Sequence, residues 1–145
     1  MKDSLKPGLE YVLRFTVPES KTVPYLFPES EIYTSMPKVL ATGFMVGLME
    51  WACTELMRPH LDDGEGSLGV HIDVSHSAAT PPGMVVEVQA RCVEVDGPRL
   101  AFAVVARDER DEIGRGTHRR HVVDWDRFTA RVDEKAALTG ATGNG

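Results

Sequence analysis

The chain has 145 residues, enough for one domain with a hydrophobic core and too few for two comfortable ones. Its hydrophobic residues make up 42% and its charged residues 26%, which is ordinary for a soluble globular protein and argues against disorder. The formal net charge of -6 repels phosphate backbones, so we expect no nucleic-acid partner. A negatively charged ligand would need a local basic patch.

The cysteines are Cys53 and Cys92, far apart and without a metal-ligand spacing. We therefore expect two buried thiols, no structural metal and a reducing compartment. The first ten residues lack the apolar stretch of a secretion signal, and no apolar run approaches the roughly 20 residues of a membrane helix. The sequence predicts a cytoplasmic protein with no membrane segment.

The first half of the chain predicts a strand, a lid and one helix. Residues 11–17 alternate and end at Pro18, which indicates a strand. Residues 18–38 hold four prolines with aromatic residues between them, a pattern typical of a packed lid or entrance loop. Residues 38–61 predict a helix that is apolar on nearly every side and therefore runs through the core.

The second half predicts four strands. Residues 68–74 alternate with a period of two, residues 84–92 do the same, and a change of phase near Val93 suggests a bulge. Asp96 and Gly97 signal a hairpin, followed by strands over residues 100–106 and 113–123. The chain becomes small and polar after Phe128, so we assign residues 1–130 to one domain and residues 131–145 to a flexible tail.

This order predicts an α+β hot-dog fold, in which a curved antiparallel sheet wraps one long central helix. We expect the four later strands to follow one another as hairpins. One sheet and one helix leave sheet edges and a helix face uncovered, which predicts a homodimer.

Glu50 is the one charged residue between positions 41 and 54. A carboxylate is costly to bury unpaired, so its presence in an apolar helix indicates pairing or reactivity. The alternative places Glu50 on a narrow solvent stripe with Thr54 and Glu55.

His76 falls on the core-facing side of its strand when positions are counted in twos from Leu68, whereas His71 falls on the other side. We expect His76 to face the central helix near Glu50, which would stabilise its charged form. The alternative is a core histidine with only a structural role.

Thr42 stands at the start of the helix, where it could be an N-cap, a catalytic hydroxyl or both. Helix N-terminal N–H groups beside it could hold a thioester carbonyl or its oxyanion. Gly69 lies inside a strand, where glycine often marks a close approach to the backbone. The basic run at residues 118–121 reads as a solvated strand end, with one arginine available for the site.

Residues 41–53 (ATGFMVGLMEWAC) strongly resemble the central helix of the fluoroacetyl-coenzyme A thioesterase family. Residues 64–69 (GEGSLG), 78–83 (AATPPG), 111–114 (DEIG) and 116–118 (GTH) are similar to the same family. The resemblance extends from about residue 21 to residue 128 and is loose at both ends.

The resemblance implies catalytic roles for Thr42, Glu50 and His76. It also implies a site glycine at Gly69 and an arginine at Arg120. The family is a hot-dog homodimer with active sites at the subunit interface. It hydrolyses fluoroacetyl-CoA in preference to acetyl-CoA and so removes a toxic metabolite.

Family members carry phenylalanines in the lid that help to form the pocket for the fluorinated carbon. This chain has Tyr33 and Met36 at those places, and we count both, with Phe44, as substrate-binding residues. We expect no cofactor beyond the CoA of the substrate, and we expect Glu50 to act as nucleophile or as general base. The alternatives are a thioesterase for another short acyl-CoA or carrier-bound acyl group, and a non-catalytic acyl-CoA-binding module.

Overall fold

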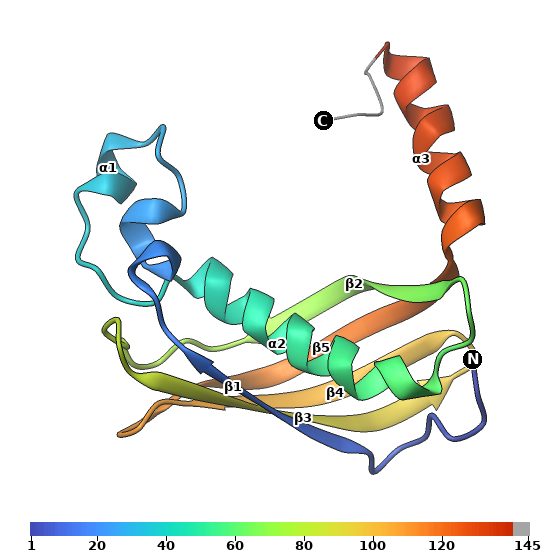
Figure 1. Ribbon diagram of the computed structural model, residues 1–145, viewed down its shortest axis with the longest axis horizontal. Coiled ribbons are helices and arrows are strands. Elements are labelled where there is room, and N and C mark those ends of the chain that lie inside the picture. Colours follow the sequence, from blue (N-terminus) through green and yellow to red (C-terminus); the bar gives the residue numbers. More distant parts are fainter. Residues whose placement is uncertain (141–145) are drawn as a thin grey trace.

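The computed structural model describes residues 1–140, which form one antiparallel sheet with a long helix lying across it (Figure 1). The strands are β1 (Glu10–Thr16), β2 (Glu65–Val74), β3 (Val85–Asp96), β4 (Arg99–Arg107) and β5 (Glu112–Asp124). The α-helices are α1 (Glu31–Thr34), α2 (Thr42–Met57) and α3 (Trp125–Thr139), and 3-10 turns lie at Glu19–Lys21, Val23–Tyr25 and Arg58–His60.

The sheet order is β1-β3-β4-β5-β2, with every neighbouring pair antiparallel. The predicted bulge near Val93 is confirmed, because the register of β3 on β4 shifts between Cys92 and Glu94. The predicted succession of hairpins is wrong for β2, which pairs with β5 instead of β3. The chain stays on β5 beyond β2, since the Ser75 and Ser77 N–H groups also donate to β5 carbonyls. This leaves β2 at one edge of the sheet and β1 at the other.

Helix α2 begins at Thr42, later than the pattern at residues 38–61 predicts, and gives way to a 3-10 turn at the Arg58–Pro59 step. One side of it packs on the sheet through Met45, Leu48, Met49, Ala52, Cys53, Leu56 and Met57, all buried. They meet the sheet's buried side chains, which include Phe102, Val88 and Val104. Each fully buried apolar side chain of this size contributes roughly 1.5–3 kcal/mol. The opposite side of α2 is more open, and Trp51 is exposed there, so the expectation of burial on most of its circumference holds for one side only.

Both cysteines are free thiols buried in this core. Burial raises the pKa of the Cys53 thiol to about 12, which keeps it protonated and unreactive.

The segment before α2 is irregular, as the prolines predict, and folds into short turns around α1. The Phe27 and Tyr33 rings pack edge to face with centroids 5.3 Å apart. The Ser30 hydroxyl caps α1 by accepting from the Tyr33 N–H at 3.3 Å. These turns form a lobe beyond the N-terminal end of α2 (Figure 1). Their position is that of a lid over the start of the helix.

The last helix corrects the expectation of a flexible tail from residue 131. Helix α3 runs from Trp125 to Thr139, capped by the Asp124 carboxylate, which accepts from the Arg127 N–H at 3.0 Å. It ends at Gly140 in the left-handed conformation and extends away from the sheet (Figure 1). Composition hid this helix, because it carries few large apolar residues. Residues 141–145, also assigned to the tail, lie outside the described part.

No helix within residues 1–140 is long and apolar enough to cross a membrane.

Candidate active site

Glu50 lies midway along α2, beside the edge of the sheet formed by β5 and β2. Its Oε1 accepts a hydrogen bond from Arg120 Nη1 at 3.2 Å, and its side chain is 43% exposed. Arg120 is itself buried, so the ion pair has one protected and one accessible partner. Glu50 is therefore paired, as expected of a carboxylate in an apolar helix, and it also borders a cavity of about 430 Å³ with Gly69 and His118. Within residues 1–140 no hydrogen bond is found for its second oxygen, Oε2.

Gly69 lies on β2 directly against the Glu50 carboxylate. A Cβ at this position would stand 2.4 Å from Glu50 Oε1 and 3.4 Å from Arg120 Nη1. Real atoms do not approach that closely, so only glycine lets the carboxylate lie against the strand. The close approach predicted from a glycine inside a strand is thus present, and the atoms that approach are those of the ion pair.

His118, two residues before Arg120 on β5, is fully buried beside the same pair. Its Nε2 lies 3.1 Å from Arg120 Nη1 and 4.0 Å from Glu50 Oε1. The interpretation of residues 118–121 as a solvated strand end is wrong for His118 and Arg120, although one arginine does reach the site. The alternation of the strand places both side chains on the inner face. Four consecutive basic residues nevertheless resemble a solvent-exposed segment, which explains the wrong interpretation.

Thr42 and His76 meet at the N-terminal end of α2. The Thr42 Oγ1 lies 2.8 Å from His76 Nδ1, and both residues line a cavity of about 310 Å³. Thr42 is the first residue of the helix, and Ala41 occupies the N-cap without a side-chain bond. The N-cap interpretation of Thr42 is therefore wrong. The N–H groups of the first helical turn lack intrahelical partners and face outward from this end.

The side chain that His76 contacts is Thr42, through its Nδ1. Its Nε2 is buried and lacks a hydrogen-bond partner within the described residues. Burial lowers the pKa of His76 below its ordinary 6.5, an effect opposed by a backbone contact with Ala78. The expectation that a nearby Glu50 stabilises the charged form of His76 is wrong, because the histidine beside Glu50 is His118.

The three residues expected to be catalytic thus form two groups within one chain. Eight residues separate Thr42 from Glu50 on α2, which corresponds to about 12 Å along the helix axis. A single thioester carbonyl does not reach across that distance.

The remaining candidates line other surfaces. Phe44 borders an apolar cavity of about 270 Å³ on the β1 side of α2, under the ammonium group of Lys21 at 4.8 Å. Tyr33 and Met36 lie in the lid around α1, where Met36 is 38% exposed. Tyr33 and Met36 are neighbours, since the Met36 N–H donates to the Tyr33 carbonyl at 3.2 Å. None of the three residues lines the cavity beside Glu50.

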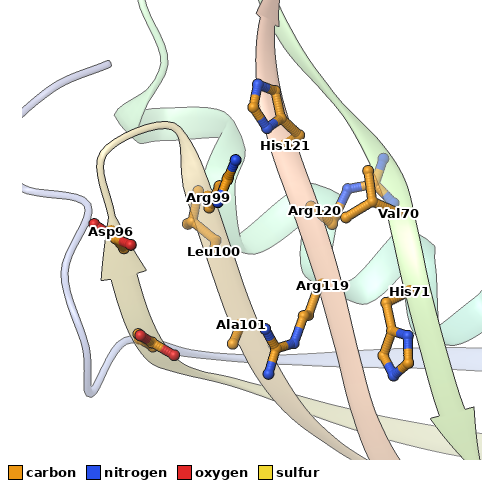
Figure 2. Close-up of a pocket in the computed structure, with 10 residues that line it drawn as sticks. Val70, His71, Asp96, Arg99, Leu100, Ala101, Arg119, Arg120 and His121 are labelled. Carbon is orange, nitrogen blue, oxygen red and sulfur yellow. The ribbon is translucent and has the colours of Figure 1, made fainter.

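A larger cavity, about 630 Å³, lies on the outer face of the sheet (Figure 2). Figure 2 shows Arg99, Arg119 and His71 around it, and Glu94 and Asp96 complete its rim. Its lining includes no residue of α2, and it shares Val70 and His71 with the Glu50 cavity. The two cavities therefore adjoin at β2, and only the cavity of about 430 Å³ is lined by Glu50.

Fold and site together define a hot-dog-fold thioesterase, and the comparisons with known proteins agree. A thioesterase superfamily member of Thermus thermophilus is 32% identical with a TM-score of 0.80, covering 91% of this chain and 96% of its own. The predicted α+β hot-dog fold is thereby confirmed.

More closely, residues 24–126 match the family model described as fluoroacetyl-CoA-specific thioesterase, and the chain belongs to that family. The fluoroacetyl-CoA thioesterase of Streptantibioticus cattleyicolor is 52% identical over 135 residues, covering 93% of this chain and 97% of the relative. A crystal structure of a mutant fluoroacetyl-CoA-specific thioesterase with fluoroacetate and CoA is 52% identical with a TM-score of 0.84, covering 86% of this chain and 99% of its own. The resemblance seen in the sequence and the enzyme class it implies are both confirmed.

Proposed function

We propose that this protein hydrolyses fluoroacetyl-CoA to fluoroacetate and CoA, and so removes a toxic thioester. Membership of the family and the 52% identical relative support this substrate. The observation that carries the chemistry is the half-exposed Glu50 carboxylate, which is held through one oxygen by buried Arg120 and lines a cavity. Buried free thiols at Cys53 and Cys92 fit a reducing compartment such as the cytoplasm.

Hydrolysis adds water to the thioester carbonyl, breaks the C–S bond and returns a proton to the departing thiolate. In one route Glu50 takes the proton from the attacking water. In the other Glu50 attacks the carbonyl itself, and water then opens the resulting anhydride. Arg120 supports both, because its hydrogen bond holds the Glu50 carboxylate in one orientation.

The Thr42–His76 pair supplies the groups for the carbonyl oxygen and the proton. The Thr42 hydroxyl stands beside the unpartnered N–H groups of the first turn of α2, which together can stabilise an oxyanion. The lowered pKa of His76 leaves its ring neutral near pH 7. The ring can therefore accept the proton released by the attacking water, directly or from Glu50, and pass it to the thiolate.

A homodimer would complete this site. In one chain the Thr42–His76 pair and Glu50 are separated by about half of α2, as described above. Strand β2 is a free sheet edge next to Glu50, and its Val70 and Ile72 are 62% and 40% exposed. Pairing of two β2 edges would bury these side chains and set the carboxylate of one subunit near the Thr42–His76 pair of the other.

The first test is hydrolysis of fluoroacetyl-CoA by the wild type and by Glu50→Gln and His76→Ala. We expect both variants to lose activity by about 100-fold or more, since each removes a proton-transfer group. Glu55→Gln is the matched control, because Glu55 is on the same helix but pairs with Arg58. A folded wild type that binds but does not hydrolyse the thioester would instead identify a non-catalytic acyl-CoA-binding module.

The acyl group is tested by comparing kcat/KM for fluoroacetyl-CoA and acetyl-CoA. The family role in detoxification requires a large preference for the fluorinated substrate. A ratio near one would contradict fluoroacetyl-CoA as the preferred substrate and favour another short or carrier-bound acyl group. The Tyr33 and Met36 side chains in the lid would then select that group. Single-turnover hydrolysis in isotopically labelled water separates the two routes, because label enters the Glu50 carboxylate only through the anhydride.

A further inference from the structure

His118 has no role in the proposed reaction, yet it is the most buried ionisable side chain beside Glu50. It is 1% exposed, and both of its ring nitrogens have partners. Nδ1 lies 2.7 Å from the backbone oxygen of His71, and Nε2 lies 3.1 Å from Arg120 Nη1. The His71 carbonyl sits where the register of β2 on β5 shifts after Gly69, a place where ladder bonding is interrupted.

These two partners determine the protonation of the ring. A carbonyl oxygen only accepts, so Nδ1 must carry the hydrogen. A guanidinium group only donates, so Nε2 must present a lone pair to Arg120. His118 is therefore neutral with its hydrogen on Nδ1. It follows that the 4.0 Å approach of Nε2 to Glu50 Oε1 is not an ion pair.

Arg120 is held at both ends of its guanidinium group. On one side Nε donates to Ser67 Oγ and Nη2 donates to the Ser67 carbonyl, each at 2.8 Å. On the other side the two hydrogens of Nη1 go to Glu50 Oε1 and His118 Nε2. Without His118 as acceptor, one buried N–H of Arg120 would lose its partner and the group could turn away from Glu50.

We propose that His118 is a positioning residue, which accepts from Arg120 Nη1 and so fixes the guanidinium group against the Glu50 carboxylate. The expected effect of His118 on kcat rests on the proposed hydrolysis, whereas the contact between His118 and Arg120 does not. Burial lowers the pKa of His118, an effect opposed by the hydrogen bond to the His71 carbonyl and reinforced by the charge of Arg120. This direction agrees with a ring that stays neutral while it accepts.

Two amide variants separate the two hydrogen bonds of the ring. In His118→Gln the amide oxygen can stand near the former Nε2 and accept from Arg120. In His118→Asn the shorter amide can donate to the His71 carbonyl but does not reach Arg120. We expect His118→Asn and the shape-preserving His118→Leu to lower kcat for fluoroacetyl-CoA by about tenfold or more with little change in KM. His118→Gln should restore kcat to within about threefold of the wild type.

His121→Asn is the matched control. His121 lies three positions after His118 on β5, and its side chain lines the cavity on the outer face of the sheet (Figure 2). This variant should leave kcat unchanged. Equal losses in folded His118→Asn and His118→Gln, or a wild-type kcat in folded His118→Leu, would overturn the proposal.

The ring tautomer gives a readout that needs neither activity nor a variant. Nitrogen-15 NMR of the histidine-labelled wild type near pH 7 should show His118 neutral, with hydrogen on Nδ1 and a lone pair on Nε2. Hydrogen on Nε2 would exclude the contact with Arg120 whatever the kinetics show. If the wild type shows the expected tautomer but does not hydrolyse fluoroacetyl-CoA, the proposed function fails and the His118–Arg120 contact stands.

Discussion

At the scale of single residues, two neighbours determine the position of the Glu50 carboxylate, one by a hydrogen bond and the other by having no side chain. Arg120 binds it, and the absence of a side chain at Gly69 makes room for it. The ion pair is partly exposed, so its own contribution to stability is small. In the proposed reaction its importance is for reactivity, because a carboxylate that is displaced by an ångström is misaligned for a thioester carbonyl.

This arrangement predicts the effect of Gly69→Ala. The new Cβ would overlap Glu50 Oε1, and the flexible, half-exposed glutamate can move away at low cost. We therefore expect kcat for fluoroacetyl-CoA to fall at least tenfold, a loss of about 1.4 kcal/mol in transition-state stabilisation. Tm should fall modestly, because the new Cβ would also stand 3.1 Å from Cε1 of the buried His118 ring.

Gly47→Ala is the control for Gly69→Ala. A Cβ at Gly47 of α2 meets nothing within 4 Å, and alanine favours a helix. Its kcat should match the wild type. If Gly69→Ala kept full activity, Glu50 could not be the group that reacts from the position seen here.

The sequence pattern correctly indicated that Glu50 is unusual in an apolar helix, but the prediction that His76 lies beside it was wrong. A charged residue in an apolar helix is visible in a single segment, whereas its partners come from β5 and β2, which register brings together. Counting in twos placed His76 near Glu50, but the register of β2 on β5 shifts between Gly69 and His71, and His76 lies beyond the end of β2. Nothing local in the sequence signals that shift. His118 was missed for another reason, because the basic run at residues 118–121 was interpreted as a solvated strand end.

At the scale of elements, the helix and strands with a clear apolar pattern were predictable from the sequence, whereas the largely polar helix α3 was not. Helix α2 and the strands carry their own signal in period and composition. Helix α3 holds mostly small and charged residues, so its signal was the Asp124 cap and the glycine at position 140. The cap was not recognised, and Gly140 was assigned to the tail. The edge position of β2 depends on long-range pairing, which no local pattern contains.

The docking of α3 yields a test. The Trp125 ring packs over Gly66 of β2 so closely that a Cβ there would stand 2.0 Å from the ring. In a Trp51→Phe background, which leaves Trp125 as the single tryptophan, Gly66→Ala should displace the ring and shift its fluorescence emission to longer wavelength. Leu138→Ala, which truncates a side chain 83% exposed on the same helix, should leave the emission unchanged. An unshifted spectrum in Gly66→Ala would contradict this packing.

At the scale of the whole molecule, the separation of the Thr42–His76 pair from Glu50 bears on how the proposed active site is assembled. The Thr42–His76 pair and Glu50 belong to different cavities of one chain, and the free β2 edge lies beside Glu50. A two-fold dimer through this edge would create two equal sites, each built from both subunits.

Mixed dimers distinguish this assembly from a site within one chain. Glu50→Gln and His76→Ala are each expected to inactivate a homodimer. If the carboxylate of one subunit serves the Thr42–His76 pair of the other, a dimer of the two variants contains one intact site and one doubly damaged site. Equal co-expression should then recover about a quarter of the wild-type kcat, since half of the dimers are mixed and each has one working site. Purified mixed dimers without activity would show that each chain supplies all three groups to its own site.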